Sequence, residues 1–200
     1  MPKVVDHAAR RRELAEALWR IARRDGIDHI SVRAVAAEAG TSPGALRHYF
    51  ATQDELAAFS LQAVVDAIQD RLTRLLPGLD PAAGAVEILE QYLPLDEQRR
   101  GEMAVYLAFL GRPHASGPLR EIRESAEARS REGVRLSLAM LASAGRVHPS
   151  RDLETETDEL YPFIDGLAVH GTLWPGRYPP GHLRRVLHRR LSQLAAPPGQ

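Results

Sequence analysis

Arg47 carries the chemistry that this sequence suggests most strongly, which is hydrogen bonding to nucleic acid. Within residues 42–50, one apolar face carries Leu46, Tyr49 and Phe50, which leaves Arg47 elsewhere on the helix. A guanidinium can donate to O6 and N7 of one guanine at once, and such a pair is worth roughly 1–3 kcal/mol of discrimination. The alternative for Arg47 is a phosphate contact, which positions a protein on DNA without reading its sequence.

Two short helices joined by a tight turn must position Arg47. Ser31 is a suitable N-cap for the first helix, and Gly40 suits the positive φ of the residue that ends it. Ser42 can cap the second helix, with Pro43 in its first turn. This order is typical of a helix-turn-helix, whose second helix enters the major groove of DNA. The alternative is a corner between two helices inside an all-helical domain.

Residues 31–56, SVRAVAAEAGTSPGALRHYFATQDEL, resemble the TetR family of one-component bacterial regulators. The MPKV opening and the HYF ending resemble its BetI-like branch, whose best-known members respond to choline. The resemblance covers the N-terminal quarter of the chain, and the rest fits only as a helical pattern. It implies base contacts near Arg47, and a weaker phosphate contact at Gln53, where many relatives have Lys. The candidate DNA-binding residues are Ser31, Arg33, Thr41, Ser42, Pro43, Gly44, Ala45, Arg47, His48, Tyr49 and Gln53.

Composition limits the kind of protein this can be. The 200 residues contain no Cys and have a net charge of zero, which argues against a thiolate zinc site and against a protein that coats nucleic acid. Residues 1–50 contain nine basic and six acidic residues, so DNA contact must come from a local patch. Because there is neither a long apolar run nor an apolar signal core, we expect a cytoplasmic protein without a membrane partner.

Helical periodicity along the whole chain predicts an all-α fold. We expect an N-terminal three-helix helix-turn-helix DNA-binding domain at 1–52 and a C-terminal helical-bundle domain for ligand binding and dimerisation at 53–200. The expected helices outside the motif are 8–25, 52–76, 81–94, 95–111, 118–144, 153–173 and 180–194.

The last two helices carry apolar stripes that we interpret as the interface of a homodimer. The segment YPFIDGLAVHG resembles the family's interface helix, although the stripes could instead pack within one chain. A twofold dimer presents two recognition helices about one DNA turn apart, so the expected partner is a palindromic operator. The candidate interface residues are Phe163, Ile164, Leu167, Ala168, Gly171, Leu183, Val186, Leu187, Leu191 and Leu194.

A small-molecule effector of unknown identity is expected inside the bundle formed by residues 81–175. Aromatic residues could line such a pocket with a few polar groups, although aromatics at helical spacing are more often core. A choline-type cation would favour an aromatic cage. The candidate pocket residues are Tyr92, Met103, Tyr106, Phe109, His114, Ser137, Phe163, His170 and Trp174.

The sequence argues against an enzyme. His182 and His188 are six residues apart, which does not suit one helical face, and no glycine-rich phosphate loop is present. We therefore expect no catalytic residue, no cofactor and no metal site. The expected function is a ligand-responsive, sequence-specific transcriptional repressor. The alternative is a helical small-molecule receptor or interaction protein that does not bind DNA.

Overall fold

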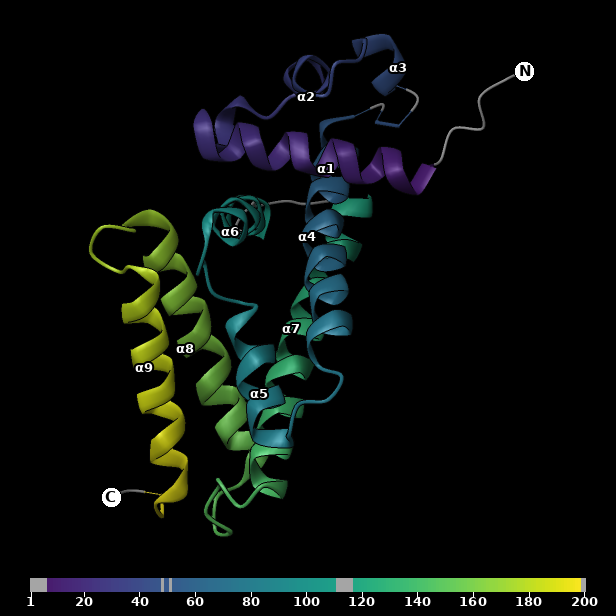
Figure 1. Ribbon diagram of the computed structural model, residues 1–200. Coiled ribbons are helices and arrows are strands. Elements are labelled where there is room, and N and C mark those ends of the chain that lie inside the picture. The colour runs from purple at the N-terminus through teal and green to yellow at the C-terminus, as the bar shows by residue number, and fades with distance from the viewer. Residues whose placement is uncertain (1–6, 48, 51, 111–116, 199–200) are drawn as a thin grey trace. The chain divides into compact units, whose positions relative to one another are not determined.

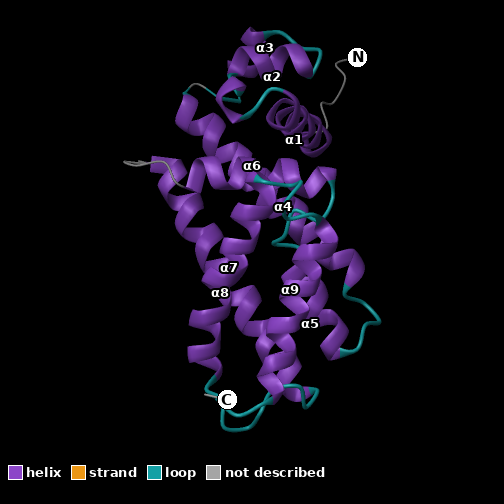
Figure 2. Cartoon of the chain, turned by 90° about the vertical axis from the view of Figure 1, so that its left-hand side faces the viewer, coloured by secondary structure: helices purple, strands orange, loops and turns teal. Residues whose placement is uncertain are grey.

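The chain folds into helices, as the sequence predicted. The computed structural model describes residues 7–47, 49–50, 52–110 and 117–198, and these residues contain helices and loops but no strand (Figure 2). The helices are α1 (His7–Arg24), α2 (Val32–Glu38), α3 (Pro43–Arg47), α4 (Gln53–Leu75), α5 (Pro81–Glu90), α6 (Glu97–Leu110), α7 (Gly117–Ser143), α8 (Leu153–Leu173) and α9 (Pro180–Ser192), with short 3-10 turns η1 (Ile27–His29) and η2 (Gln193–Ala195) (Figure 1).

The chain divides into two compact units. The first contains the residues up to Ala67 together with Ala104–Ala126, and the second contains Ile68–Met103 together with the residues from Glu127 onward. Helices α4, α6 and α7 each contribute to both units. The functional boundary between residues 52 and 53 stays a prediction.

The break between α5 and α6 is longer than the sequence suggested. α5 ends at Glu90, four residues before the expected end, because the amides of Gln91 and Tyr92 donate to carbonyls three residues back rather than four. α6 then begins at Glu97, where the carboxylate of Asp96 accepts from the amide of Arg99 at 2.7 Å. Asp96 is therefore the N-cap that sets the start of α6.

The first unit has a continuous apolar core. Leu14 and Leu18 of α1 are fully buried, as is Val35 of α2. Leu46 of α3 and Phe50 after it are 1% and 3% exposed. This core holds α3 against α1 and α2, so the residues on the other side of α3 remain at the surface.

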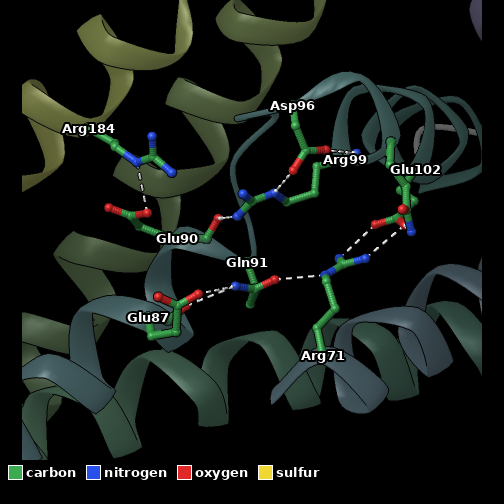
Figure 3. A network of polar contacts seen from close by, with 9 residues as sticks. Arg71, Glu87, Glu90, Gln91, Asp96, Arg99, Glu102 and Arg184 are labelled. Atoms are coloured by element: carbon green, nitrogen blue, oxygen red, sulfur yellow. Dashed lines mark hydrogen bonds and ion pairs between the residues drawn. The ribbon is translucent and has the colours of Figure 1, made fainter. Parts of the chain in front are cut away.

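A buried polar network ties α4, α5, α6 and α9 together within the second unit (Figure 3). Arg71 of α4 donates twice to the carboxylate of Glu102 on α6, at 2.8 and 2.7 Å, and once to Gln91 at 2.8 Å. The Glu102 side chain is only 3% exposed. Glu90 at the end of α5 accepts from Arg184 of α9 at 2.9 Å. These contacts fix the second half of α4 relative to the start of α6.

A second ionic cluster joins the start of α8 to the end of α9. Glu156 is 5% exposed, and its carboxylate accepts from Arg151 and from Arg190, the latter at 2.8 Å. Arg151 also donates to the backbone carbonyl of Ala196 at 2.8 Å. Burial alone would raise the pKa of Glu156, but the hydrogen bonds from Arg190 and Arg151 outweigh it and lower that pKa below its ordinary value.

Candidate nucleic-acid interface

The helix-turn-helix forms through the caps that the sequence predicted. The hydroxyl of Ser31 accepts from the amide of Ala34, and that of Ser42 accepts from the amide of Ala45, each at 3.1 Å. Gly40 lies between the two helices with a φ of +61°, a backbone conformation that residues other than glycine rarely adopt. These local interactions set where α2 ends and where α3 begins.

Seven of the eleven candidate DNA-contacting residues are exposed. Tyr49 is half-buried, with its ring centroid 6.2 Å from that of Phe50, so it spans the core and the surface. His48 lies outside the described residues. Ser31 and Thr41 are also half-buried, whereas Arg33, Ser42, Pro43, Gly44, Ala45, Arg47 and Gln53 are exposed.

An ionic brace that the sequence did not reveal holds α1 against the end of α2. Glu38 accepts from Arg20 at 2.7 Å and from Arg24 at 3.0 Å, and these two hydrogen bonds lower the pKa of Glu38 below its ordinary value. Two basic residues of α1, Arg20 and Arg24, are therefore already paired with a carboxylate within the unit. Arg33 and Arg47, by contrast, have no carboxylate partner among the described residues.

The start of α4 packs against the segment that follows α3. The hydroxyl of Thr52 caps α4 by accepting from the amide of Glu55 at 3.1 Å. The ring of Phe59 on α4 packs on Phe50 with centroids 4.8 Å apart. The first part of α4 therefore packs on the residue Phe50, which follows α3, and Gln53 stands exposed at the N-terminus of α4.

The candidate ligand-binding residues fall into a buried group and an exposed group. Met103, Tyr106 and Phe109 are buried along α6. Ser137 is buried on α7 and donates to the carbonyl of Gly133 at 2.8 Å, and Phe163 on α8 is half-buried. His114 lies outside the described residues.

His170 and Trp174 belong to a different, exposed cluster. The ring of His170 lies 5.2 Å from Trp174 and 5.1 Å from Tyr178, and Trp174 is 51% exposed. These residues surround the end of α8 and the turn that leads to α9. The ring contacts described for His170 are with Trp174 and Tyr178.

Tyr92 lies tightly against α7. A Cβ atom added at Gly133 would stand 2.1 Å from the Tyr92 hydroxyl oxygen, which is too close for any real contact. Gly133→Ala is therefore expected to cost about 1–3 kcal/mol of unfolding free energy. Gly133→Ala should cost less stability when it is made on Tyr92→Phe than on the unaltered chain, because phenylalanine lacks the clashing oxygen. Equal costs of Gly133→Ala in the two backgrounds, measured by thermal unfolding, would contradict this packing.

Most of the predicted dimer stripe is buried inside a single chain. Gly171 on α8 admits Leu183 of α9, since an added Cβ would lie 2.7 Å from a Leu183 methyl carbon. Phe163, Leu167 and Val186 are the half-buried members. The buried members are Ile164, Ala168, Gly171, Leu183, Leu187, Leu191 and Leu194. α8 and α9 therefore use much of this stripe to pack on each other (Figure 1).

Within the described part of the chain, no group of three or more His, Asp or Glu side chains is arranged to hold a metal ion. None of the described helices combines the length and the apolar character needed to cross a bilayer.

Two families match this chain. Residues 14–58 match the family described as bacterial regulatory proteins, tetR family. Residues 81–196, more than half of the chain, match the family described as BetI-type transcriptional repressor, C-terminal. The first match contains α2 and α3, and the second contains α5 to α9.

Individual relatives agree along nearly the whole length. The chain is 34% identical over 195 residues to the HTH-type transcriptional regulator PksA of Bacillus subtilis (strain 168), covering 97% of this chain and 94% of that protein. A transcriptional regulator of Rhodococcus sp. Rha1 has a TM-score of 0.77 at 35% identity, covering 94% of this chain and 99% of that one. A regulator of Saccharomonospora viridis, solved in complex with choline, has a TM-score of 0.77 at 22% identity, covering 91% of this chain and 95% of that one.

Proposed function

The chain belongs to the TetR family of bacterial regulatory proteins and is a DNA-binding transcriptional regulator, and we propose that it acts as a ligand-responsive repressor of a near-palindromic operator. The observation that supports this most directly is the exposed side of α3. It presents Gly44 and Arg47, with the capping Ser42 before them, on a helix whose opposite side is fixed in the core. Proteins of this kind are not enzymes, and we propose no catalytic role and a cytoplasmic location, where the DNA lies.

Base reading is assigned to α3 and phosphate contact to its neighbours. Arg47 donates to one guanine, and the small residues around Gly44 let the backbone approach the groove. The hydroxyls of Ser31, Thr41 and Tyr49 supply phosphate contacts, which position the reader. Gln53 supplies a neutral hydrogen bond at the N-terminus of α4, where the helix dipole also favours a phosphate.

The dimer is proposed to form through the outer faces of α8 and α9. Because the deepest residues of both stripes already pack within one chain, the partner would contact the half-buried Phe163, Leu167 and Val186, with the more exposed Leu173 beside them. Two such helices from each protomer make a four-helix bundle. Twofold symmetry then requires an inverted repeat in the DNA.

An effector in the helical bundle is proposed to control DNA binding through α4. α4 continues from the packing contact with α3 into the residues that Arg71 ties to α6. A small molecule that binds one placement of α4 better than another shifts the equilibrium by its difference in affinity. One structural relative was solved with choline and another, the multidrug binding protein EbrR, with ethidium, so an organic cation is the first class to test.

Selection of random duplex DNA on the purified protein tests the proposal. We expect enrichment of an inverted repeat, with binding that weakens steeply as salt rises because phosphate contacts release counterions. Failure to enrich any sequence at any salt concentration would favour the alternative, a helical small-molecule receptor without DNA binding.

Arg47→Ala is the variant that separates reading from positioning. We expect a loss of roughly 1–3 kcal/mol on the selected site and a relaxed preference at one base pair of each half-site. Arg23→Ala is the matched control, since Arg23 is also exposed but lies on α1. Fluorescence anisotropy on single-base variants of the site distinguishes the outcomes. Uniform weakening on every sequence would instead make Arg47 a phosphate contact.

A further inference from the structure

A cleft of about 340 Å³ opens within the first unit, and none of the candidate pocket residues of the bundle lines it. α4 contributes Ala58 and Phe59 to its wall, α7 contributes Ile122, and α1 contributes Arg11. Volumes of this order accommodate small organic ligands. Of the candidate residues for DNA, dimer or effector contacts, Tyr49 alone is among the residues that line this cleft.

The apolar part of the cleft is formed by side chains from separate elements. Phe59 is 8% exposed and Phe50 is 3% exposed, so their rings form the buried apolar wall of the cleft. Ala58 and Ile122 are half-buried and therefore still offer apolar surface. A flat or branched hydrocarbon group placed there would be removed from water without any rearrangement of the core.

Arg11 gives this cleft a positive end. Its guanidinium carbon lies 5.1 Å from the centroid of the Phe59 ring, and this placement sends Arg11 toward α4. A guanidinium stacked on a ring keeps its N–H groups free at the edges, in the fork geometry that suits a carboxylate. Among the described residues no carboxylate pairs with Arg11, whereas its neighbour Arg10 pairs with Glu13 at 2.6 Å.

The other charged group in the lining fixes the orientation of a ligand. Glu55 lies on the same cleft, as does Gln62, whose amide donates to Asp66 at 2.6 Å. A carboxylate is repelled by Glu55 and attracted by Arg11, so it must lie at the Arg11 end. A cation would instead lie near Glu55 and away from Arg11. Its apolar part would then compete with the guanidinium for the face of the Phe59 ring.

We propose that this cleft binds a small amphipathic organic acid, with its carboxylate on Arg11 and its apolar body between Phe59, Ala58 and Ile122. The site is distinct from the effector site proposed in the bundle and does not depend on it. An acid bound here contacts α1, α4 and the start of α7 together. It therefore stabilises the DNA-reading unit by mass action.

Three probes with one apolar body test the proposal: 1-naphthoate, the neutral 1-naphthalenemethanol and the cationic 1-naphthylmethylammonium. Binding to the full chain is measured by calorimetry without DNA. We expect 1-naphthoate to bind most tightly. Arg11→Gln should weaken it about tenfold, since charge-assisted hydrogen bonds are lost, while leaving the neutral probe unchanged. Arg23→Gln, on the same helix, is the matched control and should bind like the unaltered chain.

Two further variants keep the test independent of folding and of binding elsewhere. Ala58→Trp fills the apolar part of the cleft and should abolish the part of 1-naphthoate binding that depends on Arg11. If Ala58→Trp fails to fold, Ala58→Leu is used in its place. Binding of 1-naphthoate at any other site of the protein should not change in these variants.

The proposal is overturned if Arg11→Gln binds 1-naphthoate like Arg23→Gln, or if filling the cleft has no effect. It is also overturned if the cationic probe binds best and gains from Arg11→Gln. Inorganic phosphate at matched ionic strength separates an organic acid from a simple anion. Displacement of 1-naphthoate by phosphate at equal concentration would mean that Arg11 holds an anion without help from the apolar wall.

Discussion

Replacing Arg71 with alanine is expected to lower the free energy of unfolding by about 3–5 kcal/mol, the usual cost of removing one partner of a buried ion pair. Arg71 supplies two of the hydrogen bonds to Glu102, whose side chain is 3% exposed. The amide of Gln98, at 2.9 Å, remains as a partner after the change. A neutral amide does not offset the cost of a carboxylate kept out of water.

Arg74→Ala provides the matched control, because Arg74 lies one turn further along α4 and is exposed. Its effect should stay within about 0.5 kcal/mol. The double variant Arg71→Met, Glu102→Leu should regain much of the lost stability, since it removes the unpaired buried charge together with its partner. Denaturant titration measures all three variants. If Arg71→Ala were no less stable than Arg74→Ala, the network in Figure 3 would not be holding α4 to α6.

Glu156→Ala is expected to cost about 3 kcal/mol at neutral pH, because it leaves Arg151 and Arg190 without the carboxylate that they share. Glu159 is the control: it also accepts from Arg190, at 3.1 Å, but its side chain is 61% exposed. Glu159→Ala should therefore change the unfolding free energy by less than about 1 kcal/mol. Comparable losses in the two variants would show that burial does not determine the contribution of Glu156.

The same residue should make stability depend on pH. Since the pKa of Glu156 is lower in the folded than in the unfolded chain, its contribution is complete above the ordinary value of 4.5 and is lost as pH falls through the folded value. The stability difference between the unaltered chain and Glu156→Ala should therefore shrink below pH 4.5. Unfolding measured at a series of pH values checks this, and a difference that grew on acidification would have the wrong sign.

Local features of the fold could be predicted from the sequence because they depend on residues close together in the chain. Ser31, Gly40 and Ser42 each act within three or four positions, and the structure confirms all three. Helix boundaries were less certain. The end of α5 was placed at Pro94, yet the last turn already tightens after Glu90.

Ionic partners could not be predicted, because opposite charges are numerous and the sequence does not say which of them meet. Arg71 and Glu102 are 31 residues apart, and Glu90 and Arg184 are 94 apart. The same limit applies to the ion pair between Arg20 of α1 and Glu38 of α2. Only the packing of helices, which follows from apolar faces, brings these groups together.

Apolar periodicity identifies a buried face but not the element that buries it. Leu183 and Leu187 were assigned to a dimer interface, and within one chain they are already fully buried. Arg11 illustrates the same limit for a charged residue, since it contacts Phe59, which lies on a different helix. Both contacts depend on the relative placement of helices.

The spacing of the two half-sites in the selected DNA tests the central claim most directly. Two readers related by a twofold axis must reach half-sites about 10–10.5 base pairs apart, or a multiple of that, on one face of the duplex. Inserting about 5 base pairs at the centre rotates one half-site by half a turn. We expect this insertion to reduce binding to that of a single half-site and a further 5 base pairs to restore part of it. Unchanged affinity on insertion would contradict a dimer that reads both half-sites together.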